Sequence, residues 1–536
     1  MDRTVDVVAR RLFEAGCRHA FGMPGGEVLT LVDALEKSGI EFVLCKHENS
    51  AGFMAEGTCH VSGAPGILVT TIGPGLANGI NVIANAEQDR VPLVVLTGCV
   101  DADEALTYTH QIFDHQALLS PLVKSSWRLT PGGADLIADR AVMLALADRP
   151  GPVHIDIPIS VADMTVESVT SVRRVAPAPV APADGTTLDA CAAALQRAQR
   201  PIVIAGLEVL THQACAALRQ FVEHLSAPLV TTYKAKGVLS EDHRLCLGGA
   251  GLSPAADQHL LALVREADAV VLAGYDPIEM RTGWRNPWDP ESQSVIELSA
   301  VPNDHYMHHA THSFVCDIGA GLEKLAQRLT PKTGWPDDAP TATHSALRAQ
   351  FSSTGGWTVE TIIETCRREL PAETIATVDS GAHRILLSQM WSCYTPRTLL
   401  QSTGLCTMGC ALPLALGVKL TSPATPVVAF TGDAGLLMVL GELSTAVEQQ
   451  LGITVVVFVD ASLALIEMKQ RARLFGNAGV DFGRFDFAGL ARAFGGDGYS
   501  VDNVDALIDA LRKVGQSETF QLIACQIDRQ AYDGRF

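Results

Sequence analysis

The sequence predicts an α/β protein of three consecutive domains, each a parallel sheet covered by helices. Short apolar runs rich in β-branched residues alternate with helix-period segments along the chain. This alternation is typical of strands that are buried on both faces of a parallel sheet. Two segments rich in Pro, Ala or polar residues, 172–187 and 330–345, interrupt it and are predicted to be linkers. The predicted domains are therefore 1–172, 188–330 and 346–536.

Each domain contains four apolar runs that we predict to be buried strands. They are residues 41–45, 66–72, 91–98 and 151–158, then 200–206, 227–233, 269–274 and 294–299, then 374–379, 425–430, 453–459 and 520–527. The N-terminal segment is predicted to be an amphipathic helix with Val5, Val8 and Leu12 on one face. Residues 436–452 have helical spacing and are predicted to form a helix that stops at Gly452.

Bulk composition limits the classes of function. The 536 residues include 40 Lys and Arg and 59 Asp and Glu, a net charge of −19, so the chain lacks the basic balance of a nucleic-acid-binding protein. Its 13 cysteines are scattered without a Cys-x-x-Cys pair, and we interpret them as reduced thiols. No apolar run approaches the roughly 20 residues that span a bilayer, and no signal-peptide core occurs. We expect a cytoplasmic protein without nucleic-acid or membrane partners.

Two aspartates, Asp433 and Asp460, follow consecutive predicted strands of the third domain. A strand–helix–strand unit places both at the carboxyl edge of one sheet, where ligands of open α/β sheets bind. Adjacent carboxylates repel each other unless they share a cation, and Mg²⁺ prefers oxygen ligands and also binds phosphates. The N–H groups of Ala434 and Gly435 would favour an anion beside it. The pattern predicts a magnesium-bound diphosphate, although Asp433 could instead only cap the following helix.

The first domain carries different residues at the corresponding edge. Glu48 follows the strand at 41–45, and a Gly-Pro-Gly turn at 73–75 follows the strand at 66–72. Such a turn lets a ligand approach the backbone closely. Glu48 could also serve only to stabilise the start of a helix. The chain has neither a P-loop motif nor a dinucleotide fingerprint, which argues against the common nucleotide sites.

Five segments together resemble the thiamine-diphosphate-dependent enzymes of the acetolactate synthase and pyruvate oxidase type. They are "GMPGGE" at 22–27, "KHENSAGFMAEG" at 46–57, the Gly-Pro-Gly segment at 70–98, "GLCTMGCALPLALG" at 404–417, and "TGDAG" with "VVVFVDASLALI" within 431–466. The resemblance covers nearly the whole chain in the family's order. It implies a pyrimidine-binding first domain, a central domain, and a last domain that binds the diphosphate.

The resemblance also implies roles for individual residues. Asp433, Asp460 and the carbonyl of Ser462 would hold Mg²⁺. Glu48 would hydrogen-bond the aminopyrimidine ring, Met408 would support the bent cofactor, and Gln111 takes the place of an active-site glutamine. These three are the catalytic candidates. The cofactor-binding candidates are Gly25, Pro74, Ala382, His383, Cys406, Met408, Asp433, Ala434, Gly435 and Leu463.

The implied cofactors are thiamine diphosphate and Mg²⁺, and the implied reaction is decarboxylation of a 2-oxo acid with carboligation to an acceptor. Residues 274–288 and 109–126 resemble the FAD-free catabolic acetolactate synthases, so no FAD is expected. The family builds each active site between two subunits. The resemblance therefore implies a homodimer, usually assembled into a homotetramer.

Two departures from the catabolic enzymes concern the substrate. Cys406 stands where they carry Gln, and Leu463 stands where they carry Tyr. Both changes make the pocket less polar, so a simple decarboxylase or lyase acting on a more apolar 2-oxo acid stays open as an alternative. A non-catalytic relative that binds the cofactor is a second alternative. Four histidines at helical spacing, 305, 308, 309 and 312, could suggest a metal site, but we expect them to be surface or interface residues.

Overall fold

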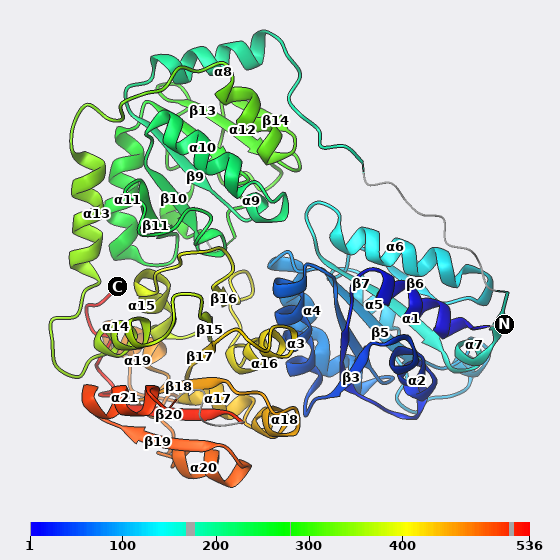
Figure 1. Ribbon diagram of the computed structural model, residues 1–536. Coiled ribbons are helices and arrows are strands. Elements are labelled where there is room, and N and C mark those ends of the chain that lie inside the picture. The colour runs from blue at the N-terminus through cyan, green and yellow to red at the C-terminus, as the bar shows by residue number, and fades with distance from the viewer. Residues whose placement is uncertain (1, 168–176, 279, 514–518) are drawn as a thin grey trace.

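The computed structural model describes residues 2–167, 177–278, 280–513 and 519–536. It contains three six-stranded parallel sheets, each covered by helices, which confirms the predicted fold class (Figure 1). Two parts of the segments discussed above lie outside the described residues. They are residues 172–176 of the first predicted linker and Glu279 of the 274–288 segment. The predicted domain boundaries stay a prediction.

The N-terminal sheet has the strand order β3-β2-β4-β5-β7-β6, and a short antiparallel pair, β1-β8, lies beside it. Its strands are β1 (Asp2–Arg3), β2 (His19–Met23), β3 (Glu41–Leu44), β4 (Gly66–Thr70), β5 (Leu93–Cys99), β6 (Ser126–Arg128), β7 (Pro152–Pro158) and β8 (Thr165–Val166). Its α-helices are α1 (Thr4–Glu14), α2 (Leu29–Ser38), α3 (Glu48–Ser62), α4 (Pro74–Gln88), α5 (His115–Leu119), α6 (Ala134–Leu146) and α7 (Ile159–Asp163). Val5, Val8 and Leu12 of α1 are all fully buried, as the amphipathic pattern predicts.

The central sheet has a different order, β11-β10-β9-β12-β13-β14. Its strands are β9 (Pro201–Ala205), β10 (Leu229–Thr232), β11 (Cys246–Ala250), β12 (Ala269–Ala273), β13 (Ser294–Ser299) and β14 (His312–Val315). Its α-helices are α8 (Thr186–Arg197), α9 (Glu208–Thr211), α10 (Cys215–Leu225), α11 (Pro254–Glu266) and α12 (Ile318–Ala326). The central domain also contains two short 3-10 helices, η4 (Tyr233–Ala235) and η5 (Thr282–Trp284). The N-terminal domain contains three, η1 (Gly26–Val28), η2 (Glu104–Leu106) and η3 (Pro131–Gly133).

The C-terminal sheet has the order β16-β15-β17-β18-β20-β19. Its strands are β15 (Ile375–Val378), β16 (Leu399–Gln401), β17 (Val427–Gly432), β18 (Thr454–Val459), β19 (Asp497–Val501) and β20 (Gln521–Gln526). Its α-helices are α13 (Ala339–Gln350), α14 (Val359–Glu369), α15 (Ala382–Met390), α16 (Ala411–Thr421), α17 (Asp433–Met438), α18 (Glu442–Glu448), α19 (Ala464–Ala472), α20 (Phe487–Phe494) and α21 (Val504–Leu511). The first of these, α13, packs on α11 of the central domain.

Three local predictions are wrong. The single helix predicted over 436–452 is two short helices, α17 and α18, which are separated at Val439–Gly441, where Lys46 packs against Gly441 and its N–H bonds Glu442. The second half of the predicted linker at 330–345 is helical because α13 begins at Ala339. Contrary to the expectation, the four histidines do not all lie at the surface or an interface: residues 300–311 form neither helix nor strand, His312 begins β14, and His308 is buried, with 3% exposed.

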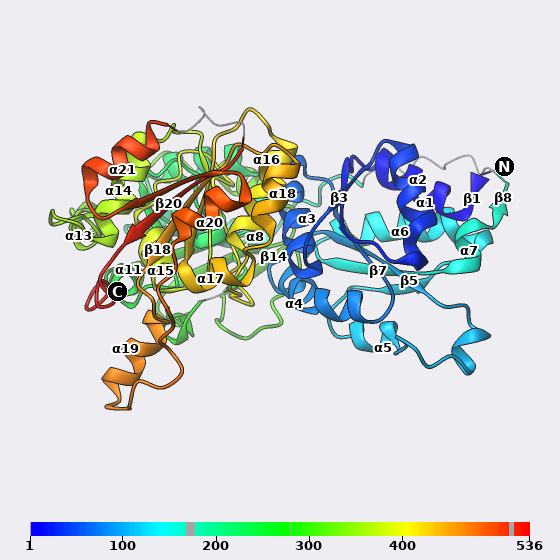
Figure 2. The ribbon, with the colours of Figure 1, turned by 90° about the horizontal axis from the view of Figure 1, so that it is seen from below.

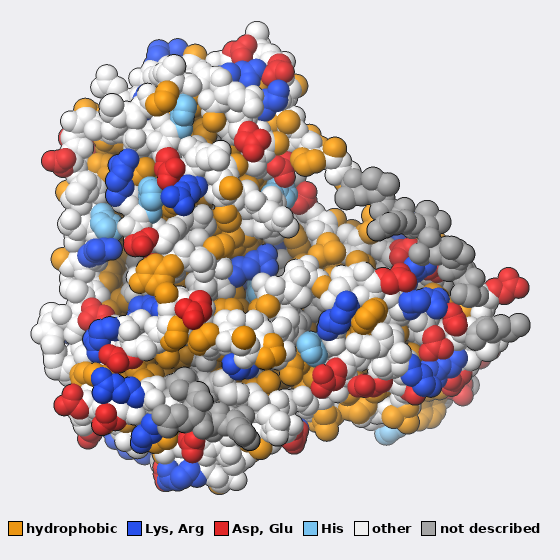
Figure 3. Space-filling view, in the orientation of Figure 1, with side chains coloured by type: hydrophobic (Ala, Val, Ile, Leu, Met, Phe, Trp, Pro, Cys, Tyr) orange, Lys and Arg blue, Asp and Glu red, His pale blue; other side chains and the backbone are white. Residues whose placement is uncertain are grey.

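The N-terminal and C-terminal domains of the chain meet through α3 and α16, which lie side by side in both ribbon views (Figures 1 and 2). Glycine permits this close packing. A Cβ on Gly417 would lie 2.0 Å from the backbone oxygen of Met54, and a Cβ on Gly57 would lie 2.4 Å from that of Leu414. Acidic and basic side chains are interspersed over the face seen in Figure 3.

Candidate active site

Three buried aspartates follow neighbouring strands of the C-terminal sheet. The strands β15, β17 and β18 are adjacent and parallel, and Asp379, Asp433 and Asp460 come directly after their last residues. Their exposed fractions are 0%, 3% and 8%. The prediction that Asp433 and Asp460 share one sheet edge is therefore confirmed.

Backbone donors fix the geometry of the Asp433–Asp460 pair. Asp433 Oδ1 accepts from Ala434 N at 2.8 Å, and its Oδ2 accepts from the N–H groups of Asp460 and Ala461 at 3.1 and 2.8 Å. Asp460 Oδ1 accepts from Ser462 N at 2.9 Å. The N–H of Ala434, which the sequence analysis expected to face a diphosphate, thus donates to the Asp433 carboxylate.

The electrostatics of this pair suit a divalent cation. Burial raises the pKa of Asp433, and burial together with the Asp433 carboxylate raises the pKa of Asp460 to about 7. A shared cation stabilises two buried carboxylates that otherwise disfavour each other's charge, and oxygen donors suit Mg²⁺. The donor set of Asp433, Asp460 and Ser462 therefore fits the predicted ion.

A cavity of about 290 Å³ lies beside these carboxylates. Its lining includes every C-terminal residue that the resemblance assigns to cofactor or metal, namely Ala382, His383, Cys406, Met408, Asp433, Ala434, Gly435, Asp460, Ser462 and Leu463. Leu252 and Arg281 of the central domain also contribute. Residues from separate parts of the sequence therefore meet in one ligand-sized space.

His383 presents an unsatisfied polar atom at this cavity. Its ring stacks on Phe458, with the ring centroids 5.2 Å apart, and burial lowers its pKa to about 4, so the ring is neutral at pH 7. Its Nε2 is buried and has no hydrogen-bond partner among the described residues. Because buried polar atoms are nearly always paired, this nitrogen fits a site that is completed by a ligand.

Gly435 is required by close packing at the start of α17. A Cβ at this position would lie 1.8 Å from Asp379 Oδ2. Asp379 in turn accepts from Cys410 N at 2.9 Å and from Thr431 Oγ1 at 3.1 Å. A side chain at position 435 would therefore displace the carboxylate that holds the start of α16, next to Met408.

The predicted residues of the N-terminal domain gather at the edge of their own sheet. Glu48 begins α3, is 5% exposed, and accepts from Asn78 Nδ2 through Oε2 at 3.0 Å. Gly73 precedes Pro74 at the start of α4, and a Cβ on Gly73 would lie 2.3 Å from the backbone oxygen of Gln111.

Gln111 lines a second cavity, of about 480 Å³, together with Glu27 and Tyr108. Gly25 belongs to the same region, because a Cβ there would lie 2.2 Å from Thr71 Oγ1, which donates to Glu27 Oε2 at 2.7 Å. The linings of the two cavities come from different parts of the chain. Within the described residues of one chain, the N-terminal candidates Gly25, Glu48, Pro74 and Gln111 do not line the cavity beside Asp433.

Four polar residues that line the C-terminal cavity were not predicted from the sequence, namely Arg281, Ser380, Arg384 and Tyr532. Asp379, which follows β15 at the same sheet edge, was not predicted either. Ser380 Oγ and Arg384 Nη1 each lie 3.3 Å from Cys406 Sγ. A signal for Asp379 was available, because it ends the apolar run at 374–379 just as Asp433 and Asp460 follow theirs. Nothing in the sequence pattern indicated that Arg384 would be buried there.

Two histidine clusters have structural partners. His115, His154 and Asp156 lie close enough to share an ion, but all four ring nitrogens already contact protein groups: Asp156, the N–H of Gly73, Thr97 and Ser126. In the 305–312 group, His308 is buried and its Nε2 lies 2.9 Å from Glu297 Oε1.

The chain matches known families over most of its length. Residues 2–118, 188–325 and 379–525 match the N-terminal TPP binding domain, the central domain and the C-terminal TPP binding domain of thiamine pyrophosphate enzymes. The "Probable 2-ketoarginine decarboxylase AruI" of Pseudomonas aeruginosa is 32% identical over 526 residues, which cover 95% of this chain and 91% of the relative. The chain belongs to the thiamine pyrophosphate enzyme family. Most of the residues that line each cavity thus fall within one of the two TPP binding domains of this family.

Other relatives are named as synthases. The "Acetolactate synthase" of Bacillus subtilis is 29% identical over 552 residues, which cover 98% of this chain and 93% of the relative. The "Acetolactate synthase, catabolic" of Raoultella terrigena is 28% identical over 543 residues, which cover 98% and 94%. The chain is therefore about equally similar to relatives named as synthases and to one named as a decarboxylase.

No helix among the described residues is long and apolar enough to cross a bilayer.

Proposed function

We propose that this chain is a thiamine-diphosphate- and Mg²⁺-dependent enzyme that decarboxylates a 2-oxo acid and joins the resulting carbanion to an acceptor. The observation that carries the proposal is the cavity at which Asp433, Asp460 and the unpaired Nε2 of His383 meet. Most of its lining belongs to the segment that matches the C-terminal TPP binding domain. Bound thiamine diphosphate would supply the electron sink that decarboxylation of a 2-oxo acid needs.

The C-terminal residues bind and orient in this proposal. Asp433, Asp460 and the carbonyl of Ser462 would hold Mg²⁺, which would offset part of the negative charge of the two acids and of the anionic tail. His383 and Ala382 would contact the diphosphate from α15, and Gly435 lets the start of α17 pack against Asp379. Met408, Cys406 and Leu463 form the less polar part of the cavity, where the rings and the substrate would lie.

The N-terminal residues supply proton transfer and complete the wall. Glu48 would hydrogen-bond the pyrimidine ring of the bound cofactor and so promote proton transfer there, while Asn78 Nδ2 donates to one carboxyl oxygen of Glu48 at 3.0 Å. Gln111, with Gly25 and Pro74 beside it, forms the wall on the pyrimidine side.

Gln111 lines a cavity separate from the one at Asp433, and Gly25, Glu48 and Pro74 do not line the cavity at Asp433 within the described part of one chain. We therefore propose that the working unit is a homodimer with each active site between subunits, assembled further into a homotetramer. Exposed apolar side chains support a second copy. The helix α19 and the turn after it project from the C-terminal domain (Figure 2). They expose Ile466, Leu474 and Phe475 by 45%, 94% and 62%, and exposed apolar patches of this kind mark interaction surfaces.

The substrate proposal rests on the lining of the cavity. Cys406 and Leu463 offer little hydrogen bonding to a substrate, which favours a 2-oxo acid with a more apolar side chain than that of pyruvate. A simple decarboxylase or lyase is the second candidate, and it is favoured by the similarity to the relative named as a decarboxylase. In either case we propose that FAD is not required.

One experiment separates these functions. The purified protein is supplied with thiamine diphosphate, Mg²⁺ and a panel of 2-oxo acids, with and without added aldehydes, while CO₂ release and product masses are followed. Carboligation predicts a product mass equal to donor plus acceptor minus CO₂. Release of the free aldehyde alone supports the decarboxylase, and no CO₂ release from any donor supports a non-catalytic relative.

A further inference from the structure

One face of α4 carries a row of polar side chains spaced by three or four residues, namely Asn78, Asn81, Asn85 and, at its C-cap, Asp89. Residues at this spacing lie on the same side of a helix. The first member bonds Glu48, and the second donates to Thr407 Oγ1 at 3.1 Å. The row therefore runs from the proposed proton-transfer residue to the segment 402–408 of the C-terminal domain.

Asp89 joins all three domains at one carboxylate. It is 1% exposed. Its Oδ1 accepts from Thr403 Oγ1 at 2.8 Å and Gly404 N at 2.6 Å, its Oδ2 accepts from Thr403 N at 3.0 Å, and Lys234 Nζ of the central domain lies 2.9 Å from Oδ2. Burial would raise the pKa of Asp89, but Lys234 and the N–H of Gly404 lower it below its usual range. The group is therefore a carboxylate that accepts every one of these hydrogen bonds.

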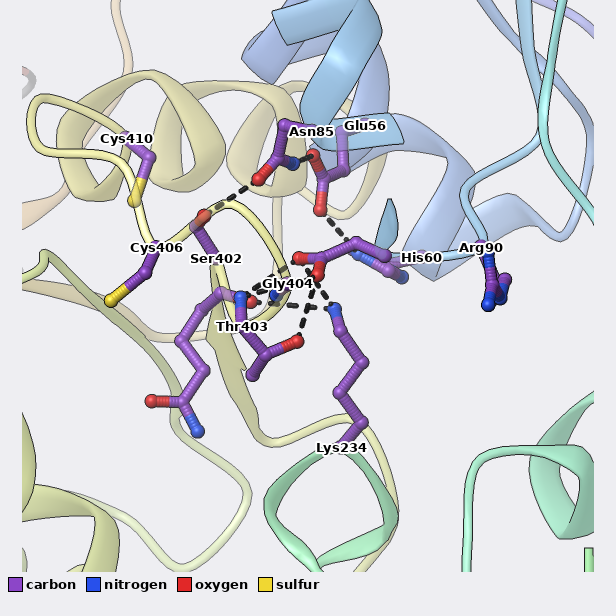
Figure 4. Close-up of polar contacts among 12 residues, drawn as sticks. Glu56, His60, Asn85, Arg90, Lys234, Ser402, Thr403, Gly404, Cys406 and Cys410 are labelled. Carbon is purple, nitrogen blue, oxygen red and sulfur yellow. Dashed lines mark hydrogen bonds and ion pairs between the residues drawn. The ribbon is translucent and has the colours of Figure 1, made fainter. Parts of the chain in front are cut away.

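Asn85 ties the same segment at a second point. Its Nδ2 donates to Glu56 Oε2 at 3.0 Å, which leaves Oδ1 to accept from Ser402 Oγ at 2.6 Å. Ser402 Oγ then accepts from Thr407 N at 3.0 Å, which closes the segment on itself. In Figure 4, Asn85 and Lys234 reach this segment from one side, and the sulfur atoms of Cys406 and Cys410 lie on the other.

The held segment carries part of the cofactor cavity. Cys406 and Met408 both line that cavity. Cys406 adopts the left-handed conformation with φ +57°, which a residue other than glycine keeps only when its surroundings impose it. Its backbone is thus held between the bonds at 402–404 and the bond at Thr407.

We propose that Asn85 and Asp89 are positioning residues, which hold the segment 402–408, and with it Cys406 and Met408, in the shape that receives the ring end of the cofactor. The inference rests on the proposed function in so far as the cavity binds thiamine diphosphate. The hold acts within one chain, whereas Glu48 is proposed to act on the site of the partner. The helix α4 would therefore serve both halves of the proposed dimer, one through Asn85 and Asp89 and the other through the bond from Asn78 to Glu48.

Labelling of Cys406 tests the hold without any activity. Of the 13 cysteines, all in the described part of the chain, Cys406 alone is exposed, so alkylation by iodoacetamide at this residue reports on the segment. In the held segment Cys406 Sγ accepts from Ser380 Oγ and Arg384 Nη1. Ser402→Ala and Thr403→Val each remove one bond to the α4 face, which should release this sulfur and raise its labelling rate about five-fold, the change expected when one ordinary hydrogen bond is lost. The matched control is Ser313→Ala, which removes the hydroxyl that donates to Glu297 Oε2 in the central domain. The background is measured with Cys406→Ser.

A second readout separates the ring end of the site from its tail end. Binding of inorganic pyrophosphate with Mg²⁺ probes only the tail site, and binding of thiamine diphosphate with Mg²⁺ probes both ends. Ser402→Ala and Thr403→Val should weaken thiamine diphosphate about five-fold and leave pyrophosphate within two-fold, roughly the error of such a comparison. A general loss of folding would weaken both ligands equally.

Each outcome decides the proposal. Faster labelling with selective weakening of thiamine diphosphate supports it. The proposal is overturned if Ser402→Ala and Thr403→Val both label at the rate of the parent and of Ser313→Ala. It is also overturned if these variants weaken the binding of pyrophosphate and of thiamine diphosphate equally. If the parent itself binds pyrophosphate but not thiamine diphosphate, the proposed function fails while the labelling result still stands. If one variant does not fold, the other carries the test.

Discussion

The N-terminal and C-terminal sheets have the same topology and different chemistry. Numbered by order in the chain, the strands of both follow the order 2-1-3-4-6-5, whereas those of the central sheet follow 3-2-1-4-5-6. In both TPP binding domains the first and third strands are neighbours. The connection after the first strand runs toward one edge of the sheet and the connection after the third strand runs toward the other edge, which creates a crevice at the carboxyl ends of these strands. The same scaffold therefore offers two equivalent places for ligand contacts.

The residues at these equivalent places differ in kind. After its third strand the C-terminal domain places Asp433, where the N-terminal domain places the Gly-Pro-Gly turn at 73–75. After its second strand it places the segment 402–408, where the N-terminal domain places Glu48. In the proposed function, one domain thus offers acids for a cation, and the other offers a single carboxyl for proton transfer. The comparison teaches that the division of labour is set by the loops and not by the sheets.

The largest effect is expected from removing a metal carboxylate. Asp433→Ala should abolish Mg²⁺-dependent retention of thiamine diphosphate, because one of the two acids of the cation site is lost. Retention on gel filtration, with and without EDTA, measures the effect. The control Asp497→Ala removes an exposed acid on β19 of the same sheet. Retention by Asp433→Ala equal to that of the control would refute the metal assignment.

The next effect separates catalysis from binding. Glu48→Gln should bind thiamine diphosphate as the parent does but lose turnover by about 100-fold or more, the usual contribution of a positioned proton-transfer group. Steady-state CO₂ release and calorimetric binding give the two quantities. Glu41→Gln changes an exposed residue of the preceding strand and serves as the control. Unchanged turnover in Glu48→Gln would remove this residue from the mechanism.

A smaller effect is expected on substrate choice. The double variant Cys406→Gln, Leu463→Tyr restores two polar groups, and it should raise kcat/KM for pyruvate relative to a branched apolar 2-oxo acid by about ten-fold. Competition between the two donors measures this ratio directly. A ratio equal to that of the parent would show that these two positions do not set the preference.

The smallest effect concerns backbone strain beside the proposed metal ligands. Ala461 has φ +57°, a conformation that asparagine tolerates better than alanine. Ala461→Asn should therefore raise the free energy of unfolding by up to about 1 kcal/mol. Thermal unfolding measures the change, and Gln450→Asn, which introduces the same residue at another positive φ of +52° away from the site, should shift in the same direction. A lower stability of Ala461→Asn would contradict this interpretation.

Hydrophobic runs and strand-end residues made most of the fold and half of the site predictable. The alternation of apolar runs predicts the parallel sheets, and two acids that follow consecutive runs predict the Asp433–Asp460 edge. Where the sequence pattern failed, long-range contacts decide the structure. The predicted helix over 436–452 is broken beside Lys46, which lies almost 400 residues earlier in the chain and bonds Glu442 across the domain boundary.

The contacts of the polar face of α4 could not be predicted from the sequence either. Asn85 and Asp89 look like ordinary polar positions of a helix, and only the packing of α3 on α16 brings them to Ser402 and Thr403. The burial of Arg384 could not be predicted from the sequence either, because it depends on the segment after β16, which places Cys406 beside the Arg384 side chain. Spacing along the sequence carries no information about such partners.

The central claim is that Glu48 of one chain completes the cavity at Asp433 of another. It is tested most directly by co-expressing Glu48→Gln and Asp433→Ala, each inactive alone, and measuring CO₂ release by the co-assembled protein. If the site lies between chains, a mixed dimer contains one intact site, so random assembly should restore about one quarter of the parent activity. If both residues serve a site within one chain, every site is defective. A mixture no more active than the separate variants would contradict the account.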